Sequence, residues 1–337
     1  MTNTNKLFLK NIHLFQKKMF MSGNINSELY LNKLNQNVVI YTQHFNNWFN
    51  LKNTKHVVKF VLLEEKQIIL NTDTVLYFWP KDKIEAIFHL KWIFSLLPKK
   101  SSIFLIGEKN SGINTAQNLL KKWIKLEKID SAKHCLLFFG KIIVRPKFQF
   151  NKFIYNKTWN FINIKTIPGI FSYNKIDAGS KLLASTFTKL IKGNVLDIGC
   201  GSGILSALLA RHSKKVKLTL IDTNIAALES SRLTLKSNNV KGDIFPSNVY
   251  SNVHKKFNLI MSNPPLHNNL KINLNCINTI ITNSMQYLKL GGEIRIVINS
   301  NISCRSLFKN TFSKYNILKK NINFKVYQAY KERCALT

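Results

Sequence analysis

Short apolar runs alternate with stretches of helical periodicity throughout the second half of this 337-residue chain. From about Thr158 onward the apolar runs are Val195–Ile198, Val216–Ile221, Lys241–Phe245, Phe257–Met261 and Glu293–Ile298. Helical patterns lie between them, at residues 204–212, 224–238 and 273–289. The glycine pair Gly291-Gly292 predicts a turn into the last run. Strands and helices in alternation predict an α/β domain whose mostly parallel sheet is covered on both faces.

The first half carries a fainter version of the same pattern. The expected strands are Val57–Leu63, Thr74–Trp79, Ile103–Ile106 and Cys135–Phe139, and the expected helices are Ile84–Leu97 and Ile113–Ile124. Gly107 and Gly112 follow the third of these strands, but they are too widely spaced for a tight cofactor-binding turn. We therefore expect two tandem domains, residues 1–157 and 158–337, with the cofactor loop confined to the second.

A glycine-rich turn joins the first strand of the second half to the helical pattern after it. Asp197 precedes Gly199, Gly201 and Gly203, and glycine at every second position lets a ligand approach the backbone at a helix N-terminus. Asp222 follows the next strand, where a carboxylate can accept hydrogen bonds from ribose hydroxyls. These features fit NAD, FAD or S-adenosylmethionine. The GxGxG spacing favours S-adenosylmethionine, as does an acid that would repel a pyrophosphate but attract an ammonium group.

The tetrad Asn263-Pro264-Pro265-Leu266 ends the apolar run at residues 257–261. Two consecutive prolines lack backbone donors and fix φ, so neither a helix nor a central strand continues through them. The result is a stiff turn that presents an asparagine amide and free carbonyl oxygens. Ligands of parallel α/β sheets bind at the carboxyl ends of the strands, so we expect Asp197, Asp222 and Asn263 in one crevice. Acceptors held in this way suit the binding of an amino group.

The chain is strongly basic, with 50 Lys and Arg against 16 Asp and Glu, a formal charge of +34 and a pI near 10.0. A protein this basic commonly binds a polyanion, and nucleic acid is the most frequent one. Abundant Lys, Asn and Ile also reflect an AT-rich coding sequence, which accounts for part of the charge. Five scattered cysteines, no signal-peptide-like start and no apolar run of bilayer length predict a soluble, intracellular protein.

Ten segments spread over nearly the whole chain carry a family resemblance: residues 77–81, 95–98, 106–108, 167–180, 195–211, 217–222, 246–251, 261–267, 290–296 and 324–327. The glycine-rich loop, Asp222 and Asn-Pro-Pro resemble class I S-adenosylmethionine-dependent methyltransferases that act on exocyclic amino groups. All the segments together resemble the small-subunit methyltransferase C family of bacterial 16S rRNA guanine-N2 methyltransferases, which modify guanine-1207. The resemblance implies two tandem class I methyltransferase-like (Rossmann-like) domains. The first would lack the cofactor loop and serve RNA recognition or structure.

The resemblance also implies a role for each matching residue. The residues expected to bind S-adenosylmethionine are Asp197, Gly199, Gly201 and Gly203 at its methionine end, Asp222 at the ribose, Asn248 at the adenine, and Asp177, Gly179 and Ser180 from the other side. The expected catalytic residues are Asn263, Pro264 and Pro265. Asn263 and the carbonyl oxygen of Pro264 would accept hydrogen bonds from the N2 amino group of guanine. The residues expected to contact the substrate base are Leu266, His267 and Phe171.

Several alternatives stay open at the level of the sequence. The same tetrad serves adenine-N6 and glutamine-N5 methylation, so the guanine substrate rests on the wider resemblance. A non-catalytic rRNA-binding assembly factor with a decayed methyltransferase fold is a further alternative, because Leu266 replaces the usual aromatic residue. His267 is either a proton acceptor or a residue that orders the turn or touches RNA. The expected partner is 16S rRNA or the 30S subunit, and we expect a cytoplasmic monomer without a metal ion or membrane segment.

Overall fold

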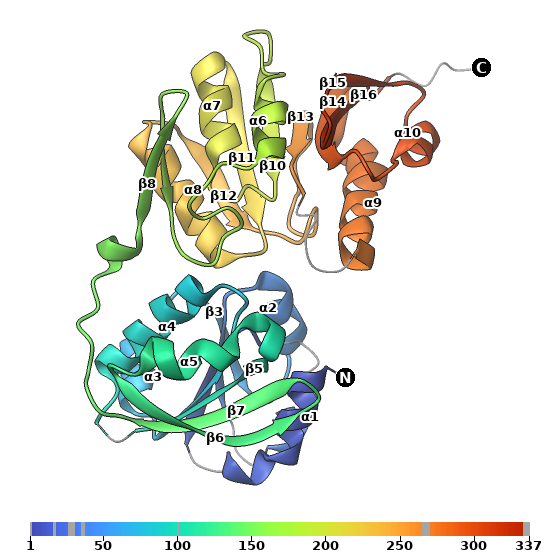
Figure 1. Ribbon diagram of the computed structural model, residues 1–337. Helices are drawn as coiled ribbons and strands as arrows, with labels where there is room; N and C mark the ends of the chain where they lie inside the picture. Colours follow the sequence, from blue (N-terminus) through green and yellow to red (C-terminus); the bar gives the residue numbers. More distant parts are fainter. Residues whose placement is uncertain are drawn as a thin grey trace. The chain divides into compact units, whose positions relative to one another are not determined.

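The computed structural model describes residues 2–15, 18–25, 31–34, 38–99, 101–264 and 270–332, apart from the side chains of Asn32 and residues 270–273. The chain divides into two compact units, Met1–Phe153 and Ile154–Thr337. The break lies four residues before the boundary that we expect from the sequence. Each unit is built on a seven-stranded sheet with helices packed against it (Figure 1).

The sheet of the first unit has the strand order β3-β2-β1-β4-β5-β7-β6. Its strands are β1 (Met19–Gly23), β2 (Val39–Thr42), β3 (Val57–Phe60), β4 (Thr74–Phe78), β5 (Ser102–Glu108), β6 (Ile124–Ala132) and β7 (Cys135–Ile142). The α-helices are α1 (Asn3–Lys10), α2 (Phe45–Leu51), α3 (Lys66–Leu70), α4 (Lys83–Leu96) and α5 (Ala116–Leu120). Strands β1 to β5 run parallel, and β7 pairs antiparallel with both β5 and β6.

Neighbouring residues of one central strand pack on opposite faces of this sheet. On β4, Val75 and Tyr77 belong to the apolar cluster that also holds Leu90 of α4. Leu76, which lies between them, packs in the cluster that holds Leu7 of α1. Burial on both faces explains why β4 and β5 are continuous apolar runs rather than alternating apolar and polar ones.

The second unit repeats the arrangement, with the strand order β12-β11-β10-β13-β14-β16-β15. Its strands are β10 (Gly193–Ile198), β11 (Val216–Asp222), β12 (Gly242–Pro246), β13 (Phe257–Ser262), β14 (Leu288–Asn299), β15 (Tyr315–Lys320) and β16 (Phe324–Tyr330). The helices are α6 (Ala178–Ala184), α7 (Ile204–His212), α8 (Ile225–Ser237), α9 (Leu270–Tyr287) and α10 (Arg305–Thr311). A separate hairpin of β8 (Tyr155–Trp159) and β9 (Ile162–Thr166) lies against α8.

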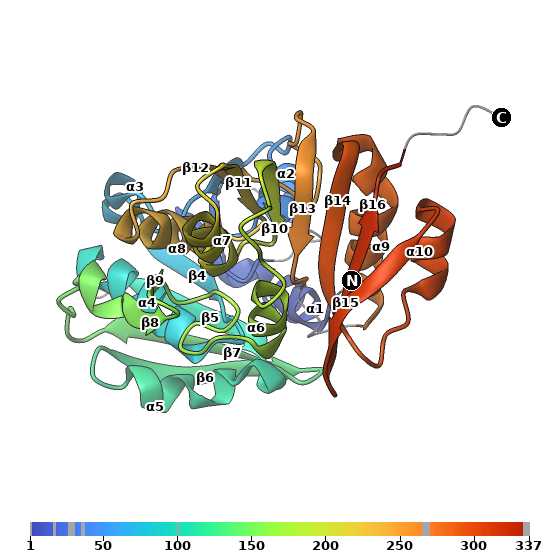
Figure 2. The same cartoon turned by 90° about the horizontal axis from the view of Figure 1, so that it is seen from above.

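One face of the second sheet is covered by α9. Ile277 and Ile281 of this helix share an apolar cluster with Ile260 of β13 and Ile296 of β14, and Figure 2 shows α9 and α10 beside β14 and β16. Strands β10 to β14 run parallel, so the carboxyl ends of β10, β11 and β13 lie at the same edge of the sheet. This edge is where a ligand binds in an open α/β fold.

The predicted alternation of strands and helices is confirmed in the second half, where the five apolar runs become β10 to β14 and the helical patterns become α7, α8 and α9. The turn predicted at Gly291-Gly292 is wrong. Strand β14 runs through both glycines, and Gly291 has φ +72° where the pairing with β13 changes register. The helix expected over 113–124 is wrong at its end, because α5 stops at Leu120 and β6 begins at Ile124.

A buried ion pair connects α6 to the sheet of the second unit. Arg295 on β14 donates two hydrogen bonds to the Glu293 carboxylate, from Nε at 3.0 Å and from Nη2 at 2.7 Å. Its Nη1 donates at 2.6 Å to the carbonyl oxygen of Thr186, just after the C-terminus of α6. Gln328 of β16 also donates to Glu293. Both charged side chains belong to nearly buried residues, so each depends on these hydrogen bonds to offset its lost hydration.

We predict that Arg295→Met destabilises the protein by about 3–5 kcal/mol, because the Glu293 carboxylate is then left buried without its partner. Urea unfolding measures this loss. Arg232→Met is the matched control, since Arg232 pairs with Glu229 on an exposed face and its loss should cost about 1 kcal/mol or less. Equal effects of the two substitutions would contradict the account.

Candidate functional site

The loop between β10 and α7 is shaped by glycines in the left-handed region of the backbone. Gly199 and Gly201 have φ +71° and +54°. A Cβ atom at Gly199 would meet nothing within 4 Å, and one at Gly201 would meet only the Gly199 carbonyl oxygen, at 4.0 Å. The loop therefore borders open space at the carboxyl end of β10, as a loop that cradles a ligand must.

Gly203 serves the packing of two helices. A Cβ atom there would lie 3.0 Å from both Cα and Oγ of Ser231 in α8. The Ser231 hydroxyl donates to the carbonyl oxygen of Gly201 at 3.1 Å, which ties the loop to the same helix. Gly203 therefore sets where α7 begins, whereas Gly199 and Gly201 leave space for a ligand.

Asp222, the last residue of β11, holds the loop in place. Its Oδ2 accepts a hydrogen bond from the Gly201 N–H at 3.1 Å, and its Oδ1 accepts one from the Asn224 N–H at 2.9 Å. Burial raises the pKa of this carboxyl above its usual value, and the backbone donors oppose the shift. Asn248 is exposed in the turn after β12, and its neighbour Ser247 donates its N–H to the Asp222 carbonyl oxygen at 3.1 Å.

Asp197 lies within β10 and is only 1% exposed. Its Oδ2 accepts a hydrogen bond from the Ser206 hydroxyl in α7 at 2.7 Å. Its Oδ1 has no hydrogen-bond partner among the described residues. Burial raises the pKa of this carboxyl to about 7, and the nearby Asp222 adds to the shift. A buried acid with one unpartnered oxygen is suited to binding a cation.

Asn263 follows β13, and its amide group is held on one side by α6. The amide nitrogen Nδ2 donates to Oδ2 of Asp177 at 2.7 Å and to Oγ of Ser180 at 2.8 Å. A carboxylate only accepts hydrogen bonds, so the atom that faces Asp177 has to be the amide nitrogen. Both hydrogens of the amide are then used within the protein, and Oδ1 is the atom left to accept a hydrogen bond from a ligand.

Asp177 has a second role that fixes its position. It is the N-cap of α6, and the oxygen that accepts from Asn263 also accepts the Ser180 N–H at 2.9 Å. A Cβ atom at Gly179 would lie 2.9 Å from Asp177 Oδ2 and 3.0 Å from Asn263 Oδ1. A side chain at residue 179 would therefore crowd both of these oxygens. The structure thus brings Asp177, Gly179 and Ser180 to Asn263 itself.

Pro264 is described and buried, whereas Pro265, Leu266 and His267 lie outside the described residues. Phe171 is half-exposed in the loop that leads into α6. None of the interactions above involves it.

Three further residues position the site and belong to no motif that the sequence makes obvious. Ser206 holds Asp197, as described above. Ser262 donates its hydroxyl to the Ile198 carbonyl oxygen at 2.8 Å and so joins the ends of β13 and β10. Asn224 caps α8 and donates to the Gly169 carbonyl oxygen at 2.8 Å. A polar residue just before a helical pattern, or in its first turn, was the available signal for Asn224 and Ser206.

Over the described part of the chain, no helix combines the length and the apolar character that crossing a membrane requires. The same residues contain no group of three His, Cys, Asp or Glu side chains placed to hold a metal ion. Cys135, Cys200 and Cys304 are buried free thiols, and Cys276 is a partly buried one.

Known families and proteins resemble this chain along nearly its full length. The family described as Methyltransferase small domain matches residues 161–328, and the one described as Methyltransferase small domain N-terminal matches residues 5–156. A "Ribosomal RNA small subunit methyltransferase C" of Buchnera aphidicola subsp. Baizongia pistaciae is 52% identical over 321 residues, which cover 94% of this chain and 98% of the relative. Its namesake from Buchnera aphidicola subsp. Acyrthosiphon pisum is 44% identical, with 98% and 99% covered.

Among solved structures, one match extends over both units. It is described as the T. thermophilus 16S rRNA N2 G1207 methyltransferase in complex with AdoMet and guanosine, with a TM-score of 0.83. The match covers 98% of this chain and 92% of the other, at 18% sequence identity. This match shows that both units of this chain have the fold of the solved structure.

Proposed function

The chain belongs to the ribosomal RNA small subunit methyltransferase C family, and on that premise we propose that it methylates the exocyclic N2 amino group of guanine-1207 in 16S rRNA. The enzyme is an S-adenosylmethionine-dependent rRNA methyltransferase. An amino group is proposed as the methyl acceptor because Oδ1 of Asn263 is the amide atom left to accept a hydrogen bond. The guanine itself is proposed from the family and from the structural relative described with guanosine.

The open space over Gly199 and Gly201 fits the cofactor. We assign its methionine end to this loop and to Asp197, whose unpartnered oxygen provides a counter-charge for the ammonium group. We assign the ribose to Asp222, because a carboxylate oxygen that already accepts one N–H has a second lone pair for a hydroxyl. Asn248, exposed in the turn after β12, is the proposed contact of the adenine. When bound, S-adenosylmethionine supplies an electrophilic methyl group on a sulfonium centre.

The Asn263 network explains how the chain can activate an amine. The lone pair of an exocyclic guanine amine is delocalised into the ring, which makes the nitrogen a poor nucleophile. Two acceptors that bind the two N–H groups, Oδ1 of Asn263 and the carbonyl oxygen of Pro264, hold this nitrogen in one orientation. Fixed acceptors that need no rearrangement during the reaction can lower the barrier by several kcal/mol.

Neither acceptor is a base at neutral pH, so these groups orient the amine and do not deprotonate it. The nitrogen would become acidic as its bond to the methyl carbon replaces the C–S bond of the sulfonium, and its proton would then pass to solvent. Asp177 and Ser180 act through Asn263, as positioning residues that keep the amide nitrogen away from the substrate. This positioning role is compatible with the direct cofactor contact that the sequence resemblance implies for them.

Two alternatives are disfavoured by specific observations. A decayed, non-catalytic module would not need the Asp177–Asn263 hydrogen bond, the open glycine loop and the buried Asp197 together, and all three are present. Adenine-N6 or glutamine-N5 methylation would use the same acceptors, but family membership favours the rRNA guanine. We further propose a cytoplasmic monomer that acts on 16S rRNA or the 30S subunit.

Nucleoside mass spectrometry of 16S rRNA from cells with and without the protein tests the proposed function. We expect N2-methylguanosine at position 1207 only when the protein is present, and its return on complementation with the wild-type chain. Unchanged modification in its absence would refute the proposed substrate, and loss of N6-methyladenosine instead would support adenine-N6 methylation.

We predict that Asn263→Ala abolishes turnover, because the substrate amine loses the oxygen that orients it, while affinity for S-adenosylmethionine stays within about threefold.

Asp177→Ala should lower kcat by about 10- to 100-fold with little change in the cofactor KM, since a small misplacement of Asn263 has this effect. Asp177→Asn, which keeps an oxygen acceptor, should restore much of the rate.

The matched control for this prediction is Asp82→Ala. Asp82, in the first unit, caps α4 by accepting a hydrogen bond from the Ile84 N–H, so its removal costs a similar helix cap, about 0.5–2 kcal/mol. Its kcat should equal that of the wild type. If Asp177→Ala and Asp82→Ala had the same kcat, the positioning role would be wrong.

The raised pKa of Asp197 predicts a pH-dependent affinity for the cofactor. Only the ionised carboxylate attracts an ammonium group, and the ionised fraction grows as the pH rises through about 7. We expect the affinity to increase about 5- to 10-fold between pH 6 and 7.5. Above that range, loss of the α-amino charge of the ligand opposes the trend.

Isothermal titration calorimetry with S-adenosylmethionine measures this dependence. Asp197→Asn should bind more weakly and with a nearly flat pH profile. Asp243→Asn, which removes an exposed acid paired with Lys255, should retain the wild-type profile. A pH dependence that survives in Asp197→Asn would show that another group is responsible.

A further inference from the structure

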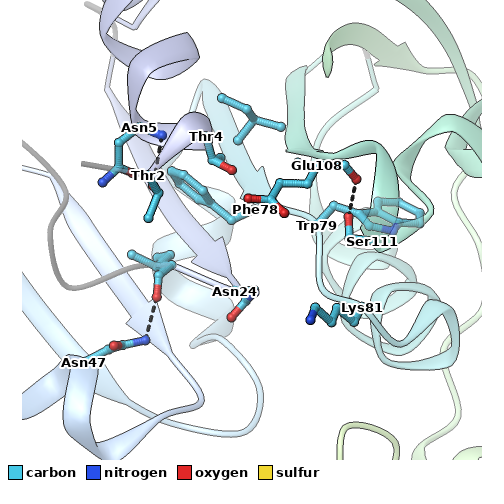
Figure 3. Close-up of a pocket in the computed structure, with 13 residues that line it drawn as sticks. Thr2, Thr4, Asn5, Asn24, Asn47, Phe78, Trp79, Lys81, Glu108 and Ser111 are labelled. Carbon is cyan, nitrogen blue, oxygen red and sulfur yellow. Dashed lines mark hydrogen bonds between the residues drawn. The ribbon is translucent and has the colours of Figure 1, made fainter. Parts of the chain in front are cut away.

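The first unit contains a cavity of about 310 Å³ at the carboxyl ends of β1, β4 and β5 (Figure 3). Its lining includes Asn24, Asn47, Phe78, Lys81 and Glu108, together with residues at the start of α1. This volume is within the range of sites that bind small molecules or single nucleotides. Nothing in the proposed function uses it.

The cavity occupies the same place in the first unit that the Asn263 network occupies in the second. The two sheets have the same strand order, so β4 corresponds to β13 and β5 to β14. Helix α1 packs on β5 and β7 as α6 packs on β14 and β16. Thr2 caps α1 by accepting the Asn5 N–H at 3.3 Å, as Asp177 caps α6. Trp79 follows β4 where Asn263 follows β13.

In the first unit, the space that corresponds to the S-adenosylmethionine site of the second unit is filled. A Cβ atom at Gly23, the last residue of β1, would lie 2.2 Å from the carbonyl oxygen of Phe78, whereas Gly199, just after β10, borders open space. The N–H of Asn24 donates to the same carbonyl oxygen at 2.8 Å, so the chain after β1 is fastened to the end of β4. Strand β2 ends in Thr42, followed by Gln43, with no carboxylate for a ribose. The remaining cavity therefore needs a different ligand.

Two opposite charges on the cavity wall define the chemistry of that ligand. The Glu108 carboxylate and the Lys81 ammonium group make no hydrogen bond or ion pair with any described residue, including each other. The indole N–H of Trp79 is also without a partner in the described part of the chain, although this side chain is 98% buried. The wall thus offers an acceptor for amino hydrogens, a cation for a phosphate and apolar surface from Phe78.

We propose that this cavity binds a second unpaired nucleotide of the substrate RNA, with the amino edge of its base at Glu108 and its phosphate at Lys81. The ligand rests on the proposed function, because it is part of the same RNA, but the cavity is separate from the methyl-transfer site. Unpaired bases splayed out of a loop are the usual targets of sequence-specific RNA recognition. Carboxylates accept hydrogen bonds from base amino groups, and lysine neutralises phosphate.

Steady-state kinetics of the full chain on 30S subunits provide the first test. Glu108→Gln and Lys81→Ala should each raise the KM for the subunit by about 5- to 10-fold, with kcat and the KM for S-adenosylmethionine unchanged. The matched controls are Glu127→Gln and Lys125→Ala, two exposed positions on β6 of the same unit that do not line the cavity. Equal KM values in all four variants would overturn the proposal.

Ultraviolet cross-linking of nucleoside monophosphates to the full chain, with peptide mapping, tests the cavity without any methyl transfer. Guanosine monophosphate should form an adduct on the segment around Phe78 and Trp79, and Glu108→Gln should remove it. Uridine monophosphate, which has no amino group, should react weakly at that segment. An adduct that is absent, equal for both nucleotides or retained in Glu108→Gln would overturn the proposal, as would displacement by a free amino acid.

The two proposals fail in distinguishable ways. A chain that forms the guanosine adduct but leaves 16S rRNA unmethylated would refute the proposed function and keep the nucleotide site. If Glu108→Gln and Lys81→Ala methylate guanine-1207 with the wild-type KM, the nucleotide site is refuted and the proposed function stands.

Discussion

The hydrogen bonds from the amide nitrogen of Asn263 to Asp177 and Ser180 are the interaction on which the proposed chemistry depends. An asparagine amide can present a donor or an acceptor, and the two choices bind opposite groups. The acceptor-only carboxylate of Asp177 removes the ambiguity, so Oδ1 is the atom available to a substrate. Asp177 is in turn fixed by capping α6, and Arg295 holds the far end of that helix to the sheet.

The two units share one sheet topology and use it for two different purposes. Both place a helix cap and the first residues after a central strand at the same edge of an identically ordered sheet. In the second unit the glycine loop keeps space for a cofactor, and Asn263 is the residue after the strand. In the first unit the chain around Gly23 closes that space, and Trp79 takes the corresponding position. What remains is a polar cavity of about 310 Å³, which we assign to the same RNA.

The sequence was sufficient for much of the catalytic unit and for part of the first unit, where β3, β4, β5, β7 and α4 were predictable. Strands β10, β11, β13 and β14 and the glycine loop were predictable because buried parallel strands are continuous apolar runs and the loop has a rare spacing. β15 was not, because nearly every residue of this edge strand is solvent-exposed. The contact of Asp177 with Asn263 joins residues 86 positions apart, and no local pattern encodes it. The end of the 113–124 helix was missed because β6 continues its apolar periodicity directly.

The central claim is that Asn263 receives the guanine amine through its oxygen while its nitrogen stays bound to Asp177 and Ser180. A high-resolution crystal structure of the enzyme with S-adenosylhomocysteine and guanosine measures this most directly. The account predicts that Asn263 Oδ1 lies about 2.7–3.2 Å from the guanine N2 atom, a hydrogen-bond distance, with the Asp177 and Ser180 contacts unchanged. A guanine amine bound by Asp177 itself, or an amide turned so that Nδ2 faces the base, would contradict it.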